Sequence, residues 1–264
     1  MRSRSMGENG IRRRNGLSAP APTLDATTAD PTGRRHHVDT RATGETVDSL
    51  MAELSDLADP AILAVNERHG DEHAVNLTRL RAVAKRVRTD HDLACALWAT
   101  DDSAARLLAV LICRPRLFTA DELDAMLRQA RTPKVQDWLI SYVVKKSTHV
   151  ETLRVAWFDD PDPVVAGAGW TLTGDRIGSG ADGLDLPELL TRIEDQMADA
   201  PDRLQWAMNG CLARIGIDHP DHRSRAIDIG ERLEVLKDYP TARGCVSPFA
   251  PIWITEMVRR QEAG

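Results

Sequence analysis

Apolar residues recur at helical spacing along residues 45–264. Within each segment the steps between them are three and four residues, which places the apolar side chains on one face of a helix. No segment of comparable length alternates between apolar and polar residues with the period of two expected of a strand. The pattern therefore predicts an all-α domain. The clearest segments are residues 80–87, 135–143, 186–197 and 204–215.

Residues that favour helix starts stand before these segments. Thr78, Asp90 and Thr148 are candidate N-caps, and Thr119 with Glu122 forms a capping-box pattern. The segments, mostly about 10 to 15 residues long and joined by short links, predict antiparallel helical hairpins stacked in series. Without a strict period, the repeats are irregular. Proline falls at predicted helix starts or breaks at Pro60, Pro115, Pro133, Pro161, Pro187 and Pro201.

Residues 1–44 lack the helical pattern. They contain eight Arg together with Pro, Thr and small residues, as in Ala19–Pro22, and little that could be buried. No apolar stretch like that of a secretory signal is present, which argues against export. We predict a disordered basic tail at 1–44 and one helical-repeat domain at 45–264. The Gly-rich segment 177–183 is predicted to separate two halves of the array.

Charge is distributed unevenly behind the formal net charge of -6. Residues 79–146 hold 13 Lys/Arg and 8 Asp/Glu, whereas residues 147–264 hold 12 and 20. Overall acidity argues against indiscriminate binding of polyanions. Equivalent positions of stacked hairpins line one concave surface, however, so the positive segment predicts a local face that binds a phosphate backbone. The alternative is a solvated face without a ligand.

Several kinds of chemistry are disfavoured. The four cysteines include no C-x-x-C pair, so neither a disulfide scaffold nor a cysteine-built zinc site is expected. The Gly-rich segment has no preceding strand and no following Lys, unlike a phosphate-binding loop. His219 and His222 flank a Pro without a third ligand nearby, which favours a turn over a metal site. No apolar stretch approaches the roughly 18 residues of a membrane span, so we expect a cytoplasmic protein with no membrane partner. We also expect a monomer that binds no cofactor and no metal.

Six tryptophans stand out in a chain with only three Phe and two Tyr. Those on or beside apolar stripes are interpreted first as core residues, with base stacking as the alternative. Trp138 differs because Lys134, Lys145 and Lys146 belong to the same predicted helix. The tryptophans interpreted as core are Trp98, Trp138, Trp157, Trp206 and Trp253.

Four stretches of the chain carry a recognisable sequence pattern. Val75–Lys85, Leu93–Trp98 and Arg106–Ala109 occur in this order, and Cys245–Ile254 near the end contains Cys-x-x-Pro-x-Ala. Together they resemble the DNA alkylation repair family, the AlkD-type DNA glycosylases. The resemblance spans about residues 45–264.

This resemblance implies a right-handed array of HEAT-like helical pairs whose concave basic face holds duplex DNA. Enzymes of the family excise cationic 3- and 7-alkylpurines without flipping the base into a pocket. An alkylated purine is already a good leaving group. A carboxylate beside the sugar then stabilises the developing oxocarbenium charge, and aromatic rings hold the deoxyribose.

The sequence departs from the family at the catalytic positions. The family's Trp-x-x-x-Asp is matched by Trp138 and Tyr142, so Tyr142 stands at the family Asp position. Asp137 precedes Trp138 in the sequence, but on a helix it points about 100° away from it, so it would not face the same place. The family's Arg, expected near residues 164–167, is replaced by a small residue. The family also has a later Trp, which is missing here near Gly210; Trp206 lies one helical turn earlier.

We therefore predict a DNA-binding family member with weak or absent N-glycosylase activity, whose partner is duplex DNA, with alkylated and branched forms as candidates. One alternative is an active alkylpurine glycosylase in which Asp137 or another carboxylate replaces the missing one. The other is a helical-repeat scaffold for a protein partner. The predicted DNA-binding residues are Arg79, Lys85, Arg86, Lys134, Trp138, Lys145 and Lys146.

Overall fold

The computed structural model describes residues 44–263, and within this range it contains thirteen α-helices and no strand. The all-α prediction is confirmed, whereas the predicted tail, apart from its last residue, lies outside the described residues. None of the helices described is long and apolar enough to cross a membrane. The α-helices are α1 (Val47–Asp56), α2 (Pro60–Glu67), α3 (Leu77–Val87), α4 (His91–Trp98), α5 (Ser103–Ile112), α6 (Ala120–Gln129), α7 (Pro133–Trp138), α8 (Val150–Trp157), α9 (Pro163–Gly178), α10 (Leu186–Gln196), α11 (Asp202–Asp218), α12 (Pro220–Leu233) and α13 (Ala250–Ala263).

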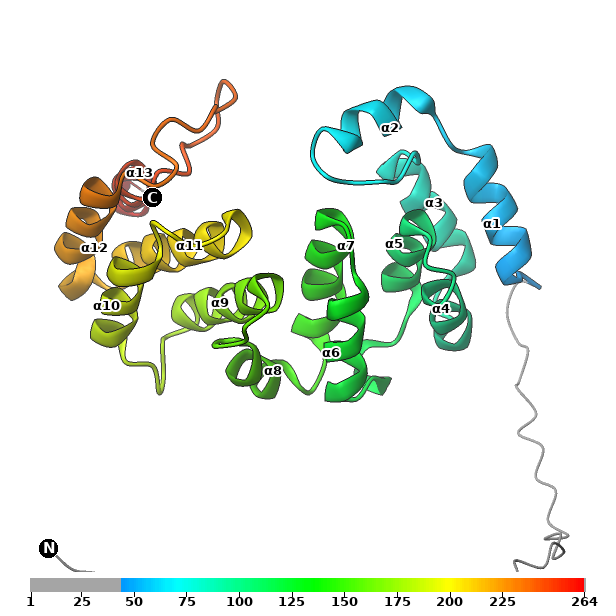
Figure 1. The fold of residues 1–264 in the computed structure, drawn as a ribbon, viewed down its shortest axis with the longest axis horizontal. Coiled ribbons are helices and arrows are strands. Elements are labelled where there is room, and N and C mark those ends of the chain that lie inside the picture. Colours follow the sequence, from blue (N-terminus) through cyan, green and yellow to red (C-terminus); the bar gives the residue numbers. More distant parts are fainter. Residues whose placement is uncertain (1–43, 264) are drawn as a thin grey trace, which may run out of the picture. The chain divides into compact units, whose positions relative to one another are not determined.

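The helices follow one another in chain order as stacked antiparallel pairs (Figure 1). One layer consists of odd-numbered helices: α3 packs on α5 and α5 on α7, while α9 packs on α11 and α11 on α13. The intervening even-numbered helices pair with their neighbours, as α4 does with α5, α8 with α9 and α12 with α13. The arrangement agrees with the predicted series of helical hairpins.

Two apolar cores meet in α9. Val165, Ala168 and Leu172 belong to the first core, which extends back to α1, whereas Trp170 and Ile177 belong to the second, which extends to α13. Helix α9 also approaches α8 closely, because a Cβ on Gly169 would lie 2.6 Å from the backbone nitrogen of Phe158. The division therefore falls within α9, and the prediction that the Gly-rich segment 177–183 separates the two halves is wrong: that segment contains the end of α9 and the link to α10.

Two of the predicted helix caps are confirmed and two are displaced. Asp90 accepts from the Leu93 N–H, and Thr119 with Glu122 forms the complete capping box. Asn76, not Thr78, caps α3 by accepting from the N–H groups of Thr78 and Arg79. The N-cap of α8 is His149 rather than Thr148, without a side-chain capping bond. An Asn earlier in the chain is at least as good a cap as Thr, which explains the first displacement.

The predicted helix over residues 135–143 is irregular. Regular α-helix ends at Trp138, after which η2 (Leu139–Val143) is a π-helix and η3 (Val144–Lys146) is a 3-10 turn. Val135, Leu139 and Val143 remain buried along one side. Single π-turns inside helices occur often at functional sites. The change of winding therefore directs attention to the side chains that this run presents.

Candidate nucleic-acid interface

Two cations and two aromatic rings form a row from α3 to η3. The Arg81 guanidinium lies 4.6 Å from the ring centroid of Trp138, whose ring meets Tyr142 edge-on at 5.2 Å between centroids. The Lys146 ammonium lies 5.3 Å from the Tyr142 ring. Each cation–π contact contributes about 0.5–1 kcal/mol at exposed sites. We call these four residues the cation–aromatic row.

The row holds its cations at the surface. Trp138 is only 7 % exposed, and Tyr142 is half-buried, while Arg81 and Lys146 are exposed. Neither cation has a carboxylate partner within residues 44–263. The rings therefore support two positive charges that remain available to an anion, and the Trp138 ring itself presents little surface.

The basic residues of α3 point to two different sides of the helix. Arg81 and Lys85 are four residues apart and share one side, toward Trp138. Arg79 and Arg86 lie on the other side, where Arg86 forms ion pairs with Glu45 and with Glu53 of α1. The Arg86 charge is thus engaged within the protein, whereas Arg79 and Lys85 are exposed without an ion pair in the described range.

A basic groove opens between η1 (Pro115–Leu117) and η3. Its volume is about 770 Å³, and four cationic side chains line it. Lys145 forms an ion pair of 2.6 Å with Asp175 of α9, while the other three have no carboxylate partner among the residues described. Burial raises the pKa of the neighbouring Cys113 thiol to about 12, so this thiol is not a nucleophile at neutral pH. The four cations are Arg114, Arg116, Lys145 and Lys146.

The predicted DNA-binding residues are thus gathered only in part. Trp138, Lys145 and Lys146 come together around Tyr142 and the basic groove. Lys134 stands at the start of α7, where its backbone N–H donates to Asp71 Oδ1 at 2.7 Å.

The tryptophans interpreted as core are buried at positions 98, 138 and 157, but that expectation is wrong for Trp206, which is 42 % exposed and contacts Tyr239.

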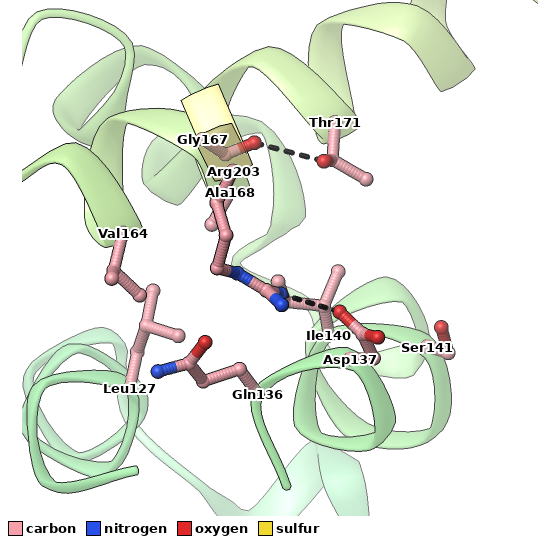
Figure 2. A pocket seen from close by; sticks show the side chains of 10 residues that line it. All are labelled: Leu127, Gln136, Asp137, Ile140, Ser141, Val164, Gly167, Ala168, Thr171 and Arg203. Carbon is pink, nitrogen blue, oxygen red and sulfur yellow. Dashed lines mark hydrogen bonds and ion pairs between the residues drawn. The ribbon is translucent and has the colours of Figure 1, made fainter. Parts of the chain in front are cut away.

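A second pocket lies on another side of the α7–η2 run, at the junction of the two cores. It measures about 290 Å³, and Asp137 and Arg203 of α11 pair across it at 2.5 Å (Figure 2). Gly167 and Ala168 of α9 form part of its wall, where the resemblance implies an Arg. An arginine is therefore present, but α11 supplies it. We call this space the junction pocket.

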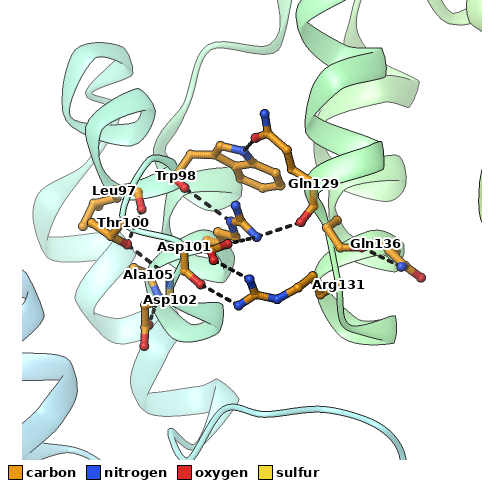
Figure 3. A network of polar contacts seen from close by, with 11 residues as sticks. Leu97, Trp98, Thr100, Asp101, Asp102, Ala105, Gln129, Arg131 and Gln136 are labelled. Carbon is orange, nitrogen blue, oxygen red and sulfur yellow. Dashed lines mark hydrogen bonds and ion pairs between the residues drawn. The ribbon is translucent and has the colours of Figure 1, made fainter.

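A buried arginine network holds α4, α5 and α6 together (Figure 3). Arg106 is 6 % exposed, donates to the carbonyls of Trp98 and Gln129, and pairs with Asp101 at 2.7 Å. Arg131 also pairs with Asp101. Desolvation by burial lowers the pKa of Arg106, and the nearby Asp101 opposes that shift. Arg106 is therefore structural and not available to a ligand, whereas Arg131 is exposed and its charge is engaged by Asp101.

The sequence profile of the family described as "DNA alkylation repair enzyme" matches residues 50–246, about three quarters of the chain. The chain belongs to this family. Two proteins of similar sequence are uncharacterised proteins of Listeria. One, from Listeria innocua, is 23% identical over 226 residues, which is 81% of this chain and 98% of its own length. The other, from Listeria monocytogenes, is 22% identical over 199 residues, covering 71% and 86%.

A solved structure of similar fold belongs to a family of proteins related to the HEAT-like repeat DNA glycosylases, with affinity for branched DNA structures. It superposes with a TM-score of 0.66 at 19% identity, covering 82% of this chain and 95% of its own. The likeness shows that this member of the DNA alkylation repair family is a HEAT-like helical repeat, as the sequence resemblance predicts.

Some residues of the interface escaped the sequence prediction. Arg81 was part of the basic segment, and its four-residue spacing from Lys85 could have placed the two on one side of α3. Gln136, which is buried beside the junction pocket, lies outside the predicted apolar stripe and carried no such signal. Arg203 could not have been linked to Asp137, because 66 residues separate them.

Proposed function

We propose that this protein binds duplex DNA, including branched forms, through the cation–aromatic row and the basic groove. The observation that carries the proposal is the set of surface cations held without carboxylate partners around Tyr142. Phosphate contacts by Lys and Arg supply most of the sequence-independent affinity for DNA. The affinity for branched structures of the protein with a similar fold supports the extension to branched DNA.

Lysine and arginine have different tasks in this proposal. Arg81, stacked on Trp138, presents a planar guanidinium that suits two phosphate oxygens at once. Lys146 and the groove arginines Arg114 and Arg116 extend the positive surface along the bound DNA strand. Trp138 is a positioning residue because its buried ring fixes Arg81 and Tyr142.

We further propose that excision of alkylpurines is weak or absent. In this proposal Tyr142 stands at the family Asp position, where a phenol replaces the carboxylate that would stabilise charge on the sugar. Asp137 is the carboxylate nearest in sequence, but its charge is balanced by Arg203 at 2.5 Å. An active enzyme would have to break this pair before Asp137 could stabilise an oxocarbenium ion.

The scaffold alternative has less support. A protein-binding face would be expected to show a contiguous exposed apolar patch. Within the described part of the chain, the large exposed apolar residues lie on separate elements, and two of them, Trp206 and Tyr239, form an aromatic contact. They are Val65, Leu117, Val155, Trp206, Tyr239 and Ile252.

Fluorescence anisotropy with a labelled duplex and a labelled three-way junction tests the DNA-binding proposal. The double variant Arg81→Ala with Lys146→Ala should bind both DNAs on the order of 50-fold more weakly at 0.1 M salt, because two phosphate contacts are lost. The loss should be the same for different sequences, since phosphates carry no base identity.

Arg232→Ala is the matched control. Arg232 is also an exposed arginine, but it lies on α12 and pairs with Glu194. This variant should bind DNA like the wild type. Absence of DNA binding by the wild-type protein at low salt, or equal binding by the double variant, would overturn the proposal.

A further inference from the structure

One buried acceptor in the junction pocket has no hydrogen-bond partner. Gln136 is 5 % exposed, and its Oε1 is unpartnered among the residues that the structure describes. In Figure 2 its side-chain amide lies inside the pocket between Leu127 and Arg203. An unsatisfied buried polar atom costs about 1–3 kcal/mol, so its presence calls for a ligand or another explanation.

The orientation of this amide is fixed by its other half. Gln136 Nε2 donates to the carbonyl of Ala130 at 2.7 Å. A carbonyl can only accept, so the nitrogen must face Ala130, and in Figure 2 the oxygen lies on the side of Arg203. The junction pocket therefore offers an acceptor at its buried end.

The rest of the pocket defines the chemistry of its occupant. Its apolar walls come from Leu127, Ile140, Val164 and Ala168, while Asp137 and Arg203 are partly exposed and offer charged groups at one side. About 290 Å³ is near the lower end of the range for small-molecule sites. A flat, mostly apolar group with one inward N–H donor fits this combination.

We propose that the junction pocket receives an unpaired nucleobase that carries an exocyclic amino group, which donates to Gln136 Oε1. The inference rests on the proposed DNA binding and adds a base-reading site to it. The guanidinium of Arg203 lies beside the bound base, where it can donate to a ring nitrogen. A base held in a duplex would not reach the pocket, so the site selects DNA with unpaired bases, such as branched or bulged forms.

The pocket lies within reach of the proposed DNA-binding surface. Asp137, Ser141 and Lys145 follow one another at four-residue spacing and form the exposed side of the α7–η3 run. The junction pocket lies on one flank of this exposed side and the cation–aromatic row on the other. A helix with its side chains is about 10–12 Å wide, so DNA crossing this side contacts both.

Three bulged duplexes test the proposal. They are identical except at one unpaired position, which holds adenine, purine without the 6-amino group, or an abasic site. Wild-type protein should bind the adenine bulge about three- to tenfold more tightly than the purine bulge, the value of one hydrogen bond, and the abasic bulge most weakly.

Gln136→Leu removes the acceptor while keeping similar bulk. This variant should bind the adenine and purine bulges equally, with its affinity for the abasic bulge unchanged. Gln196→Leu is the matched control, because Gln196 is exposed at the end of α10, and it should keep the wild-type preference. Ser141→Phe, at the exposed mouth of the pocket, is a second variant that should also abolish the preference for adenine over the abasic site.

The outcomes separate this inference from the proposed function. Equal binding of all three bulges by the wild type, or an adenine preference that survives both Gln136→Leu and Ser141→Phe, overturns the base-reading pocket but leaves DNA binding intact. Failure of the wild type to bind any of the DNAs overturns the proposed function itself and this inference with it.

Discussion

Residues 79–146 and residues 147–263 contain nearly equal numbers of cations but use them differently. Of the 13 Lys/Arg in the first region, five form ion pairs with carboxylates within the described range. Of the 12 in the second, nine do so. The first region therefore leaves eight cations without a carboxylate partner in the described range, and the second leaves three, of which Arg176 and Arg223 donate to backbone carbonyls.

The difference shows what net charge alone conceals. The excess of carboxylates in the second region engages its arginines in surface pairs, as Glu194 does with Arg225 and Arg232. In the first region four of the free cations, Arg81, Arg114, Arg116 and Lys146, lie where aromatic rings and short 3-10 turns support them. A binding face is thus defined by cations that lack internal partners, not by the count of basic residues.

Charge reversal in the two regions should give the largest contrast. Arg114→Glu with Arg116→Glu places two negative charges in the basic groove, and we expect duplex DNA affinity to fall on the order of 100-fold or more at 0.1 M salt. Arg225→Glu with Arg232→Glu changes the same number of charges on α12. Comparable losses in the two double variants, measured by anisotropy, would remove the distinction between the regions.

Asp101→Asn tests whether the paired cations of the first region are structural. Without this carboxylate the buried Arg106 keeps only its carbonyl partners, and the free energy of unfolding should fall by about 1–3 kcal/mol. Asn tolerates the left-handed backbone at this position, where φ is 63°.

Thermal denaturation measures that loss of stability. Asp195→Asn, at an exposed position of α10, should leave the melting temperature within about 1–2 °C of wild type. DNA affinity of Asp101→Asn should not decrease, because Arg131 is released from its pair. Weakened DNA binding by a folded Asp101→Asn protein would contradict the division into structural and available cations.

Tyr142→Asp should cancel one available cation. The new carboxylate would lie beside Lys146, so we expect about a tenfold loss of duplex affinity at 0.1 M salt. Tyr142→Phe keeps the ring contacts with Trp138 and Lys146 and should stay within about twofold of wild type. Release of 3-methyladenine from methylated duplex should not exceed spontaneous depurination for the wild type. Efficient release would refute the proposed loss of activity.

The smallest effect should be the loss of stability at low pH through the ion pairs that join Asp124 of α6 and Asp160, which follows α8, to Arg128. Hydrogen bonds from Arg128 hold the pKa values of Asp124 and Asp160 below the ordinary range of a carboxylic acid. Because these pKa values are lower in the folded protein, the stabilisation is complete above about pH 4 and is lost as the pH falls further.

Melting temperature as a function of pH measures this contribution. Asp124→Asn should melt about 2–4 °C lower at pH 7, with a smaller difference at pH 3, since surface ion pairs contribute at most about 1 kcal/mol. A difference between variant and wild type that grows as the pH falls would have the wrong sign.

Local sequence signals predicted the helices and several of their ends. Helical spacing fixes the buried side of α3 at Leu80, Val83 and Val87, and Thr119 with Glu122 forms a cap from contacts three residues apart. These interactions form within one element, so the sequence suffices to predict them. The π-helix after Trp138 carries no local signal in the helical spacing of its apolar residues.

The candidate site depends on pairs of residues distant in the sequence. Arg86 was grouped with Lys85, but its carboxylate partners in α1 remove it from the free cations. Arg81 meets Trp138 from another helix. The sequence could therefore indicate the basic segment and direct attention to Tyr142, whereas only the structure shows which cations gather around that tyrosine.

The salt dependence of duplex binding tests the central claim most directly. If four to six free cations contact phosphates, the logarithm of the dissociation constant should rise with the logarithm of salt concentration with a slope of about 4 to 5, and Arg81→Ala with Lys146→Ala should lower that slope by about 2. A slope near zero, or one that this double variant leaves unchanged, would contradict the account.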